Sequence, residues 1–218
     1  MKQAANKKPR LNDRAASVHQ IMNTNFKTLD FEGEWLNLLG CPELKGGWII
    51  WGHSFNGKTS LALQLCKYLS KFAKVAYNSL EEGLSKSMKS AIIRTGMDGC
   101  RGNFILLDRE PLALLRERLS KKKSPRVIVI DSWQFTGGTY ADYQQLINDF
   151  PNKLFIIISH ADGKNPSGSV AKKIRYDAFV KIWVEGYKAF ANSRYGGGKP
   201  YTIYDKGAYE YWGETENN

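Results

Sequence analysis

Short apolar runs alternate with amphipathic stretches along most of the chain. Residues 127–130 are all β-branched, which is typical of a strand buried on both faces. Runs of this kind predict strands at residues 48–51, 74–79, 103–107, 126–130 and 154–159. Apolar residues at helical spacing predict helices at residues 58–72, 83–95, 111–119 and 140–150. This alternation predicts an α/β fold with a mostly parallel central sheet flanked by helices.

The two ends of the chain follow other patterns. Residues 1–15 are polar and basic, which predicts a flexible arm ahead of a single domain at residues 16–218. Residues 178–212 alternate aromatic and polar side chains, which predicts a β-rich C-terminal part.

Composition narrows the class of protein. No apolar run is long enough to cross a membrane, and the first residues lack the apolar core of a signal peptide. The three cysteines lie far apart in the sequence and form no CxxC pair, which disfavours a zinc site or a disulfide framework. We therefore expect a cytoplasmic protein with no membrane partner.

The charge of the chain is uneven. Lys and Arg number 32 against 21 Asp and Glu, a formal net charge of +11. The excess lies in residues 1–14, 109–126 and 164–188. Clusters of this kind favour a polyanionic partner, although a solvated lysine-rich face would give the same pattern.

One motif carries clear chemistry. Residues 52–59 read Gly-His-Ser-Phe-Asn-Gly-Lys-Thr, which matches every fixed position of a phosphate loop between a strand and a helix. Its backbone amides would surround a phosphate, Lys58 would reach the β- and γ-phosphates of ATP, and Thr59 would ligate Mg²⁺. The expected nucleotide-binding residues are Gly52, His53, Ser54, Phe55, Asn56, Gly57, Lys58, Thr59 and Ser60.

Two strand ends supply carboxylates. Asp131 follows the predicted strand 126–130, where it can hold the Mg²⁺ shell, and no acidic residue comes directly after it. A catalytic base must therefore come from elsewhere. Ser79-Leu80-Glu81-Glu82 ends the strand that follows the phosphate-loop helix, which would aim a carboxylate at the γ-phosphate.

With these motifs in place, residues 28–205 resemble the RecA/DnaB/KaiC-type P-loop ATPase core. The chain is most like the minimal RecA-core ATPases of phages and mobile elements. In that family the Glu of a Ser-x-Glu strand end activates water, which implies that Glu81 rather than Glu82 is the base. Asp131-Ser132-Trp133-Gln134 resembles the helicase form of the second nucleotide motif. His160 stands at the γ-phosphate sensor position, where replicative helicases have Gln.

The resemblance also implies partners. Residues 161–170 are rich in Gly, Ser, Asn and Pro and correspond to a mobile loop that faces nucleic acid in the family. The cations assigned to single-stranded DNA are Lys164, Lys172, Lys173 and Arg175. Arg194 matches a catalytic arginine that reaches the neighbouring subunit's γ-phosphate, although Asn192 replaces the lysine expected beside it. A homo-oligomer, either a hexameric ring or a filament, is therefore expected.

Three functions remain open at this point. The first is an ATP-hydrolysing RecA-like protein that acts on single-stranded DNA in recombination, repair or replication. The second is a small DnaB-like helicase motor. The third is a P-loop kinase of small molecules, which is disfavoured because the sequence offers no clear lid arginines.

Overall fold

The computed structural model describes residues 15–213, so the predicted basic arm lies almost entirely outside the described residues. In this part of the chain nine strands form one sheet, in the order β3-β2-β4-β5-β1-β7-β8-β9, with β6 paired to β5. The strands are β1 (Gly46–Gly52), β2 (Val75–Ser79), β3 (Phe104–Asp108), β4 (Val127–Asp131), β5 (Leu154–Asp162), β6 (Asn165–Pro166), β7 (Val180–Glu185), β8 (Lys188–Ser193) and β9 (Tyr201–Thr202).

Pairing is parallel from β3 across to β7 and antiparallel from β7 to β9. The described helices are α1 (Val18–Met22), α2 (Gly33–Leu39), α3 (Lys58–Leu69), α4 (Lys86–Thr95), α5 (Leu112–Leu119), α6 (Tyr140–Asp149), α7 (Ser169–Asp177) and α8 (Asp205–Trp212), with short 3-10 helices η2 (Met97–Cys100) and η3 (Trp133–Thr136). The predicted α/β class, with a mostly parallel sheet, is confirmed.

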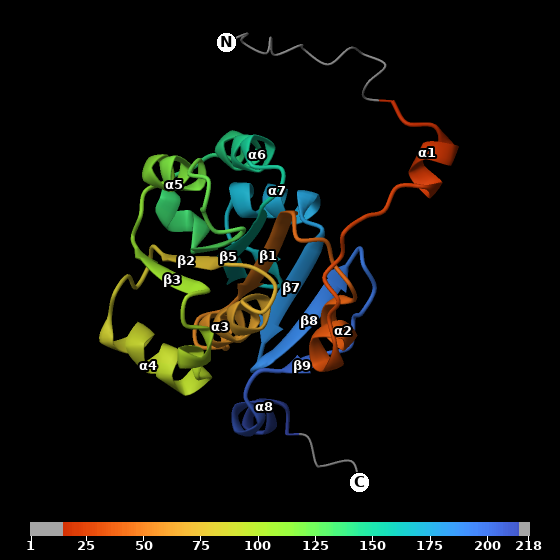
Figure 1. Cartoon of the computed structure of the whole chain (residues 1–218). Helices are drawn as coiled ribbons and strands as arrows, with labels where there is room; N and C mark the ends of the chain where they lie inside the picture. Colours follow the sequence, from red (N-terminus) through yellow and green to blue (C-terminus); the bar gives the residue numbers. More distant parts are fainter. Residues whose placement is uncertain (1–14, 214–218) are drawn as a thin grey trace.

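The strand β1 shows how the two layers of helices form. Its side chains alternate between the faces of the sheet. Trp48 and Ile50 belong to the same buried cluster as the leucines of α3, whereas Ile49 and Trp51 belong to the cluster that includes α5, α6 and α7. Figure 1 shows α5, α6 and α7 on one side of the sheet and α3 and α4 on the other. Both faces of the central strands are therefore buried, as their continuous apolar runs predicted.

The predicted β-rich C-terminal part is confirmed, but it ends in a helix. Residues 180–202 form β7, β8 and β9, but the Tyr-rich stretch that follows is the helix α8. Its Gly207 and Ala208 are buried, and a Cβ at Gly207 would lie 2.6 Å from the Tyr187 ring. Aromatic residues favour strands on average, but here the packing of a small-residue face against Tyr187 decides in favour of a helix.

The prediction of a loop over residues 161–170 is wrong for most of its length. Residues 161–166 form a short hairpin of β5 and β6, and α7 then begins at Ser169. Ala171 and Ile174 of α7 are buried, with Ala178 directly after the helix. Their three- and four-residue spacing is a helical signal that was readable in the sequence but was masked by the Gly- and Ser-rich stretch before it.

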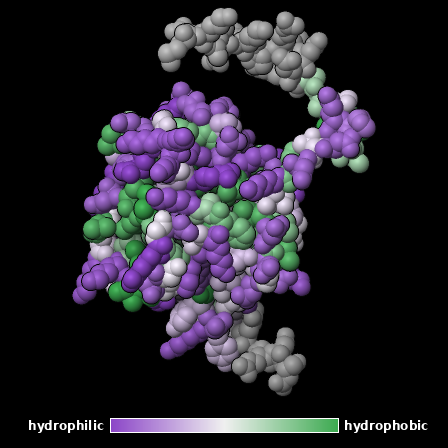
Figure 2. Space-filling model, viewed as in Figure 1, coloured by the Kyte–Doolittle hydropathy of each residue, from purple (hydrophilic) through white to green (hydrophobic). Residues whose placement is uncertain are grey.

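The helix α1 lies apart from the rest of the described chain, whereas Thr28 already forms a β-bridge with Glu43. All five residues of α1 are exposed, and Figure 1 shows this helix standing away from the sheet and its covering helices. Figure 2 shows hydrophilic side chains over most of the visible face, with hydrophobic ones in separate patches. Within residues 15–213, no helix is long and apolar enough to cross a membrane.

Candidate nucleotide-binding and catalytic site

The phosphate loop joins the end of β1 to the start of α3. Gly52 is required by packing, because a Cβ there would lie 2.3 Å from the carbonyl oxygen of Val184 on β7. Gly57, immediately before α3, has a φ of 98°, which side chains rarely adopt. The loop is tied to the β7–β8 turn by the Asn56 Oδ1, which accepts a hydrogen bond of 2.7 Å from the Gly186 amide. Two glycines and this anchor fix the loop in front of the N-terminus of α3.

Lys58 is the first residue of α3. Its Nζ donates a hydrogen bond of 2.8 Å to the His53 carbonyl, across the phosphate loop. Burial lowers the pKa of Lys58 below its ordinary value, whereas the charges of Asp131 and Glu81 raise it. Both carboxylates therefore favour the charged form of the amine, which can pair with an anion in the loop.

Asp131 ends β4 and is almost completely buried. Burial raises its pKa to about 6, against the effect of a hydrogen bond donated by the Tyr77 hydroxyl to Oδ2. Its carbonyl oxygen accepts hydrogen bonds from the amides of Leu80, at 2.6 Å, and Glu81, at 3.2 Å. These bonds connect the predicted metal-binding strand directly to the strand end that carries the predicted base.

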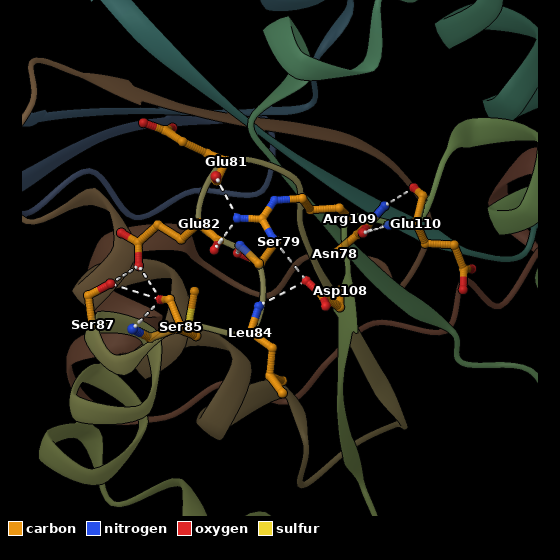
Figure 3. A network of polar contacts seen from close by, with 12 residues as sticks. Asn78, Ser79, Glu81, Glu82, Leu84, Ser85, Ser87, Asp108, Arg109 and Glu110 are labelled. Atoms are coloured by element: carbon orange, nitrogen blue, oxygen red, sulfur yellow. Dashed lines mark hydrogen bonds and ion pairs between the residues drawn. The ribbon is translucent and has the colours of Figure 1, made fainter.

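Glu81 and Glu82 point in different directions, although they are adjacent in the sequence (Figure 3). The Glu82 carboxylate accepts hydrogen bonds from Ser87 at 2.8 Å and Ser85 at 3.5 Å, at the start of α4. The Glu81 carboxylate instead lies 3.3 Å from Nε2 of His160, which follows Ser159 in β5. The geometry therefore directs Glu81 toward the predicted sensor and holds Glu82 at the start of α4.

A polar network supports the turn that carries these glutamates. Arg109, just after β3, donates to the Glu82 carbonyl at 2.6 Å and to the Glu81 carbonyl at 3.5 Å (Figure 3). The Asp108 Oδ1 accepts from the Leu84 amide at 2.9 Å. The sequence prediction missed Arg109. Glu81 and Glu82 precede it by 28 and 27 positions and become its neighbours only through the pairing of β2 with β3.

The expected sensor region lies beside this network. Gln134 lies in η3, and its Nε2 donates to the Ser159 hydroxyl at 2.7 Å and to the Ser167 carbonyl at 3.2 Å. His160 is partly exposed and pairs in register with Gly52 of β1. A ligand at the phosphate loop and the imidazole therefore lie at the same edge of the sheet.

The donors around Asp131 fit a hydrated Mg²⁺ ion. The Asp131 carboxylate and the Thr59 hydroxyl are hard oxygen donors, which suit a cation that keeps waters and substrate phosphates in its shell. Within residues 15–213, the buried Ser132 hydroxyl next to Asp131 has no hydrogen-bond partner, so it can bond a water of such a shell. The same part of the chain contains no cluster of three or more His, Cys, Asp or Glu residues able to hold a metal by themselves.

The sequence prediction also missed two tyrosines near the phosphate loop. A cavity of about 530 Å³ is lined by Ser60, Gln64, Tyr187 and Tyr204, among others. The two tyrosine rings lie 5.8 Å apart at a near right angle. Aromatic faces at this position can stack on a planar base.

The four cations assigned to nucleic acid do not form one cluster. Lys164 lies in the β5–β6 hairpin, and Arg175 bonds Asn165 in that hairpin at 2.6 Å. Lys172 also reaches this hairpin, with its Nζ 3.8 Å from Asp162, which pairs with Asn165, whereas the Lys173 Nζ lies 5.8 Å from the Tyr140 ring centroid on α6. Only Lys164 and Arg175 share one groove, which they line together with residues of β7 and β8.

Arg194 lies at the other end of the sheet. It follows Ser193, which pairs with Val180 at the start of β7, and Val180 pairs with Trp48 near the start of β1. The Arg194 amide donates to the Phe179 carbonyl at 3.0 Å, and its guanidinium lies 4.7 Å from the Phe179 ring centroid. The arginine is therefore separated from the phosphate loop of its own chain by the length of β1.

Comparison with known proteins gives fold neighbours only. No protein-family model matches the chain, and no curated protein sequence matches it. A KaiC-like protein from the hyperthermophilic archaeon Pyrococcus horikoshii OT3 is similar, with a TM-score of 0.57, 14% identity and coverage of 81% of this chain and 93% of that one. The flagellar accessory protein FlaH from Methanocaldococcus jannaschii is also similar, with a TM-score of 0.52, 17% identity and coverage of 82% of this chain and 92% of that one.

The ATPase domain of G40P is a further neighbour, with a TM-score of 0.51, 14% identity and coverage of 72% of this chain and 80% of that one. Identities this low show the fold and not the activity. In this fold a phosphate loop, a strand-end glutamate and a strand-end aspartate lie together at the carboxyl edge of the sheet, where ligands of open α/β sheets bind. The chain therefore has the RecA-like fold of the RecA/DnaB/KaiC-type P-loop ATPase core.

Proposed function

We propose that the chain is a Mg²⁺-dependent ATPase that acts on single-stranded DNA as a homo-oligomer, in recombination, repair or replication. The observation that carries this proposal is the meeting of Lys58, Glu81 and Asp131 at one edge of the sheet. The Glu81 amide bonds the Asp131 carbonyl, and Lys58 begins the helix that follows the phosphate loop at the same edge. The ATPase neighbours in the comparisons support the same class of reaction.

Each residue of this group has a role in the proposed hydrolysis. Glu81 accepts a proton from the attacking water. The oxygen of that water bonds the γ-phosphorus while the bond from this phosphorus to the bridging oxygen of ADP breaks. Lys58 stabilises the charge that develops on the phosphoryl oxygens. Thr59 and Asp131 would hold Mg²⁺, which supplies further charge neutralisation at the β- and γ-phosphates. His160 contacts Glu81 and can report the presence of the γ-phosphate to the β5–β6 hairpin.

The proposed ATPase is tested by measuring phosphate release with and without single-stranded DNA. We expect hydrolysis that stops when EDTA removes Mg²⁺ and that rises when oligo(dT) is added. A rate that does not respond to oligo(dT) would contradict the DNA-dependent part of the proposal. Transfer of the phosphoryl group to a small metabolite instead of water would support the kinase alternative. Strand separation in a duplex-unwinding assay would favour a helicase motor over an annealing or recombination role.

The position of Arg194 favours action on a neighbouring subunit. The arginine lies at the opposite end of β1 from its own phosphate loop, so it can complete only a site on another copy of the chain. We expect the single variants Lys58→Ala and Arg194→Ala to be inactive. Mixing them should restore part of the activity, because an intact Lys58 on one subunit then meets an intact Arg194 on the next.

The mixing result is checked with a matched control. Lys199→Ala removes a cation five residues further along the chain, beyond the Gly-rich stretch, and should hydrolyse ATP at the parent rate. A mixture that stays inactive, while size-exclusion chromatography gives a monomer with and without nucleotide, would refute the trans role of Arg194.

A further inference from the structure

The antiparallel strands β7 and β8 have one buried face and one partly exposed face. Val180, Ile182 and Val184 of β7 pack into the core, and the residues between them point to the other side. Those alternate positions hold Lys181, Trp183 and Glu185, all partly exposed. The exposed face is therefore not a conventional polar surface, because it carries a large aromatic ring between charged residues.

An aromatic row crosses this face. Trp51 of β1 pairs in register with Trp183 of β7, which pairs with Phe190 of β8. The Trp51 and Trp183 ring centroids are 5.8 Å apart. Trp51 is buried at the inner end of the row, whereas Trp183 and Phe190 keep part of their rings exposed. Two ring surfaces are thus available on a rigid sheet.

Cations surround the row. Lys164, Arg175 and Lys181 line a groove of about 440 Å³ together with Trp51, Trp183, Phe190 and others, and among the described residues that line it Glu185 is the only acidic one. The Arg175 guanidinium lies 5.0 Å from the Trp51 ring centroid, and the Lys164 carbonyl accepts a hydrogen bond of 3.1 Å from the Trp51 Nε1. Within residues 15–213, neither the Lys164 nor the Lys181 amine forms an ion pair with an acidic residue.

We propose that this groove binds a single strand of nucleic acid, whose bases stack on Trp183 and Phe190 and whose phosphates contact Lys164, Arg175 and Lys181. Exposed rings next to cations form the combination that binds single strands without sequence preference. The inference rests on the proposed function, and it places the principal binding surface on β7 and β8 rather than on Lys172 and Lys173. A second copy of this chain is a poorer occupant, because the copy is itself strongly basic.

The groove also borders the nucleotide site. The Trp183 ring lies 6.0 Å from the ring of His53 in the phosphate loop, at a near right angle. The turn between β7 and β8 bonds Asn56 of the same loop. A base that displaces or fixes the Trp183 ring therefore acts on a residue that contacts the phosphate loop, which gives a direct route for DNA to alter ATP turnover.

The first test measures the affinity of the full chain for fluorescein-labelled oligo(dT) by fluorescence anisotropy over a range of salt concentrations. Trp183→Leu should weaken binding roughly tenfold, the loss of one stacked base, and leave the salt dependence unchanged. Lys181→Gln should lower the slope of log affinity against log salt by about 0.7, the value for one phosphate contact on a single strand. The control variants Tyr209→Leu and Lys206→Gln, both on exposed positions of α8, should match the parent.

A second measurement separates stacking from a structural effect. Trp183→Phe keeps an aromatic face, so its affinity should stay within a few-fold of the parent. Its intrinsic tryptophan fluorescence should be quenched less by unlabelled oligo(dT), because the stacked indole has been removed. Parallel titrations with oligo(U) show whether the strand is DNA or RNA.

Each outcome bears on one proposal. If Trp183→Leu binds oligo(dT) with the parent affinity and Lys181→Gln keeps the parent salt slope, the proposal that this groove binds a single strand is wrong. If only the double variant Lys172→Gln/Lys173→Gln loses affinity, the binding surface lies on α7 and the proposed function stays intact. No binding of oligo(dT) or oligo(U) by the parent at low salt would refute the nucleic-acid part of the proposed function, and the groove with it. If the Trp183→Leu variant changes only the oligomeric state, the exposed face of β7 and β8 is a subunit interface instead. If Trp183→Leu does not fold, Lys181→Gln and Trp183→Phe decide the result.

Discussion

Replacing Lys58 by alanine is expected to abolish ATP hydrolysis. The amine lies across the phosphate loop on the His53 carbonyl, and the charges of Asp131 and Glu81 favour its charged form. It is therefore placed to neutralise the phosphoryl group as it transfers, and the loss of one such stabilising donor costs roughly 10²–10³ in rate. The measurement is phosphate release at saturating ATP and Mg²⁺, together with the affinity for a fluorescent ATP analogue.

Lys67→Ala is the matched control for this variant. Lys67 lies on the same helix, α3, but its Nζ bonds the Thr95 carbonyl at 3.0 Å, away from the phosphate loop. Its loss should leave turnover at the parent rate. A Lys58→Ala protein that turns over as fast as the Lys67→Ala protein would show that the phosphate loop does not act in catalysis.

Replacing Glu81 by glutamine is expected to lower the hydrolysis rate by about 10²–10⁴ and to leave ATP binding intact, since loss of a general base has this effect. Glutamine keeps the size of the side chain and a hydrogen bond to His160, but it cannot accept the proton of water at the same position. Single-turnover hydrolysis and equilibrium ATP binding, measured on the same preparation, separate the two effects.

The neighbouring residue provides the decisive comparison. Glu82→Gln should hydrolyse ATP at nearly the parent rate, because the Glu82 carboxylate bonds Ser87 and Ser85 at the start of α4. Its loss should appear instead as a small decrease in thermal stability. If Glu82→Gln binds ATP without hydrolysing it, and Glu81→Gln remains active, the assignment of the base is wrong.

Local patterns in the sequence determined the architecture of the core. Buried parallel strands require continuous apolar runs, and helices between them require apolar residues at helical spacing, so both signals can be read within short windows. The phosphate loop is equally local, because its glycines, Lys58 and Thr59 must follow one another between a strand and a helix. Asp131 was predictable for the same reason, as the polar end of a buried strand.

Only the tertiary structure decided how the site is assembled. Whether Glu81 or Glu82 faces the phosphate loop depends on contacts with His160, Ser87 and Arg109, which lie on other elements of the fold. The hydrogen bond of Tyr77 to Asp131 arises from the pairing of β2 with β4. These contacting residues lie too far apart in the sequence to be read from any short stretch of it.

In the C-terminal half, too, contacts between distant residues decided structure that the local sequence pattern did not predict. The Gly- and Ser-rich residues before α7 suggested a loop but form the β5–β6 hairpin, and the aromatic residues of α8 suggested a strand but form a helix that buries Ala208. The sequence by itself determined the order of strands and helices from β1 to β5 and the position of the phosphate-loop motif, because these depend on neighbouring residues. The direction of Glu81 and the aromatic row on β7 and β8 depend on sheet register, which brings distant residues together and only the folded chain can set.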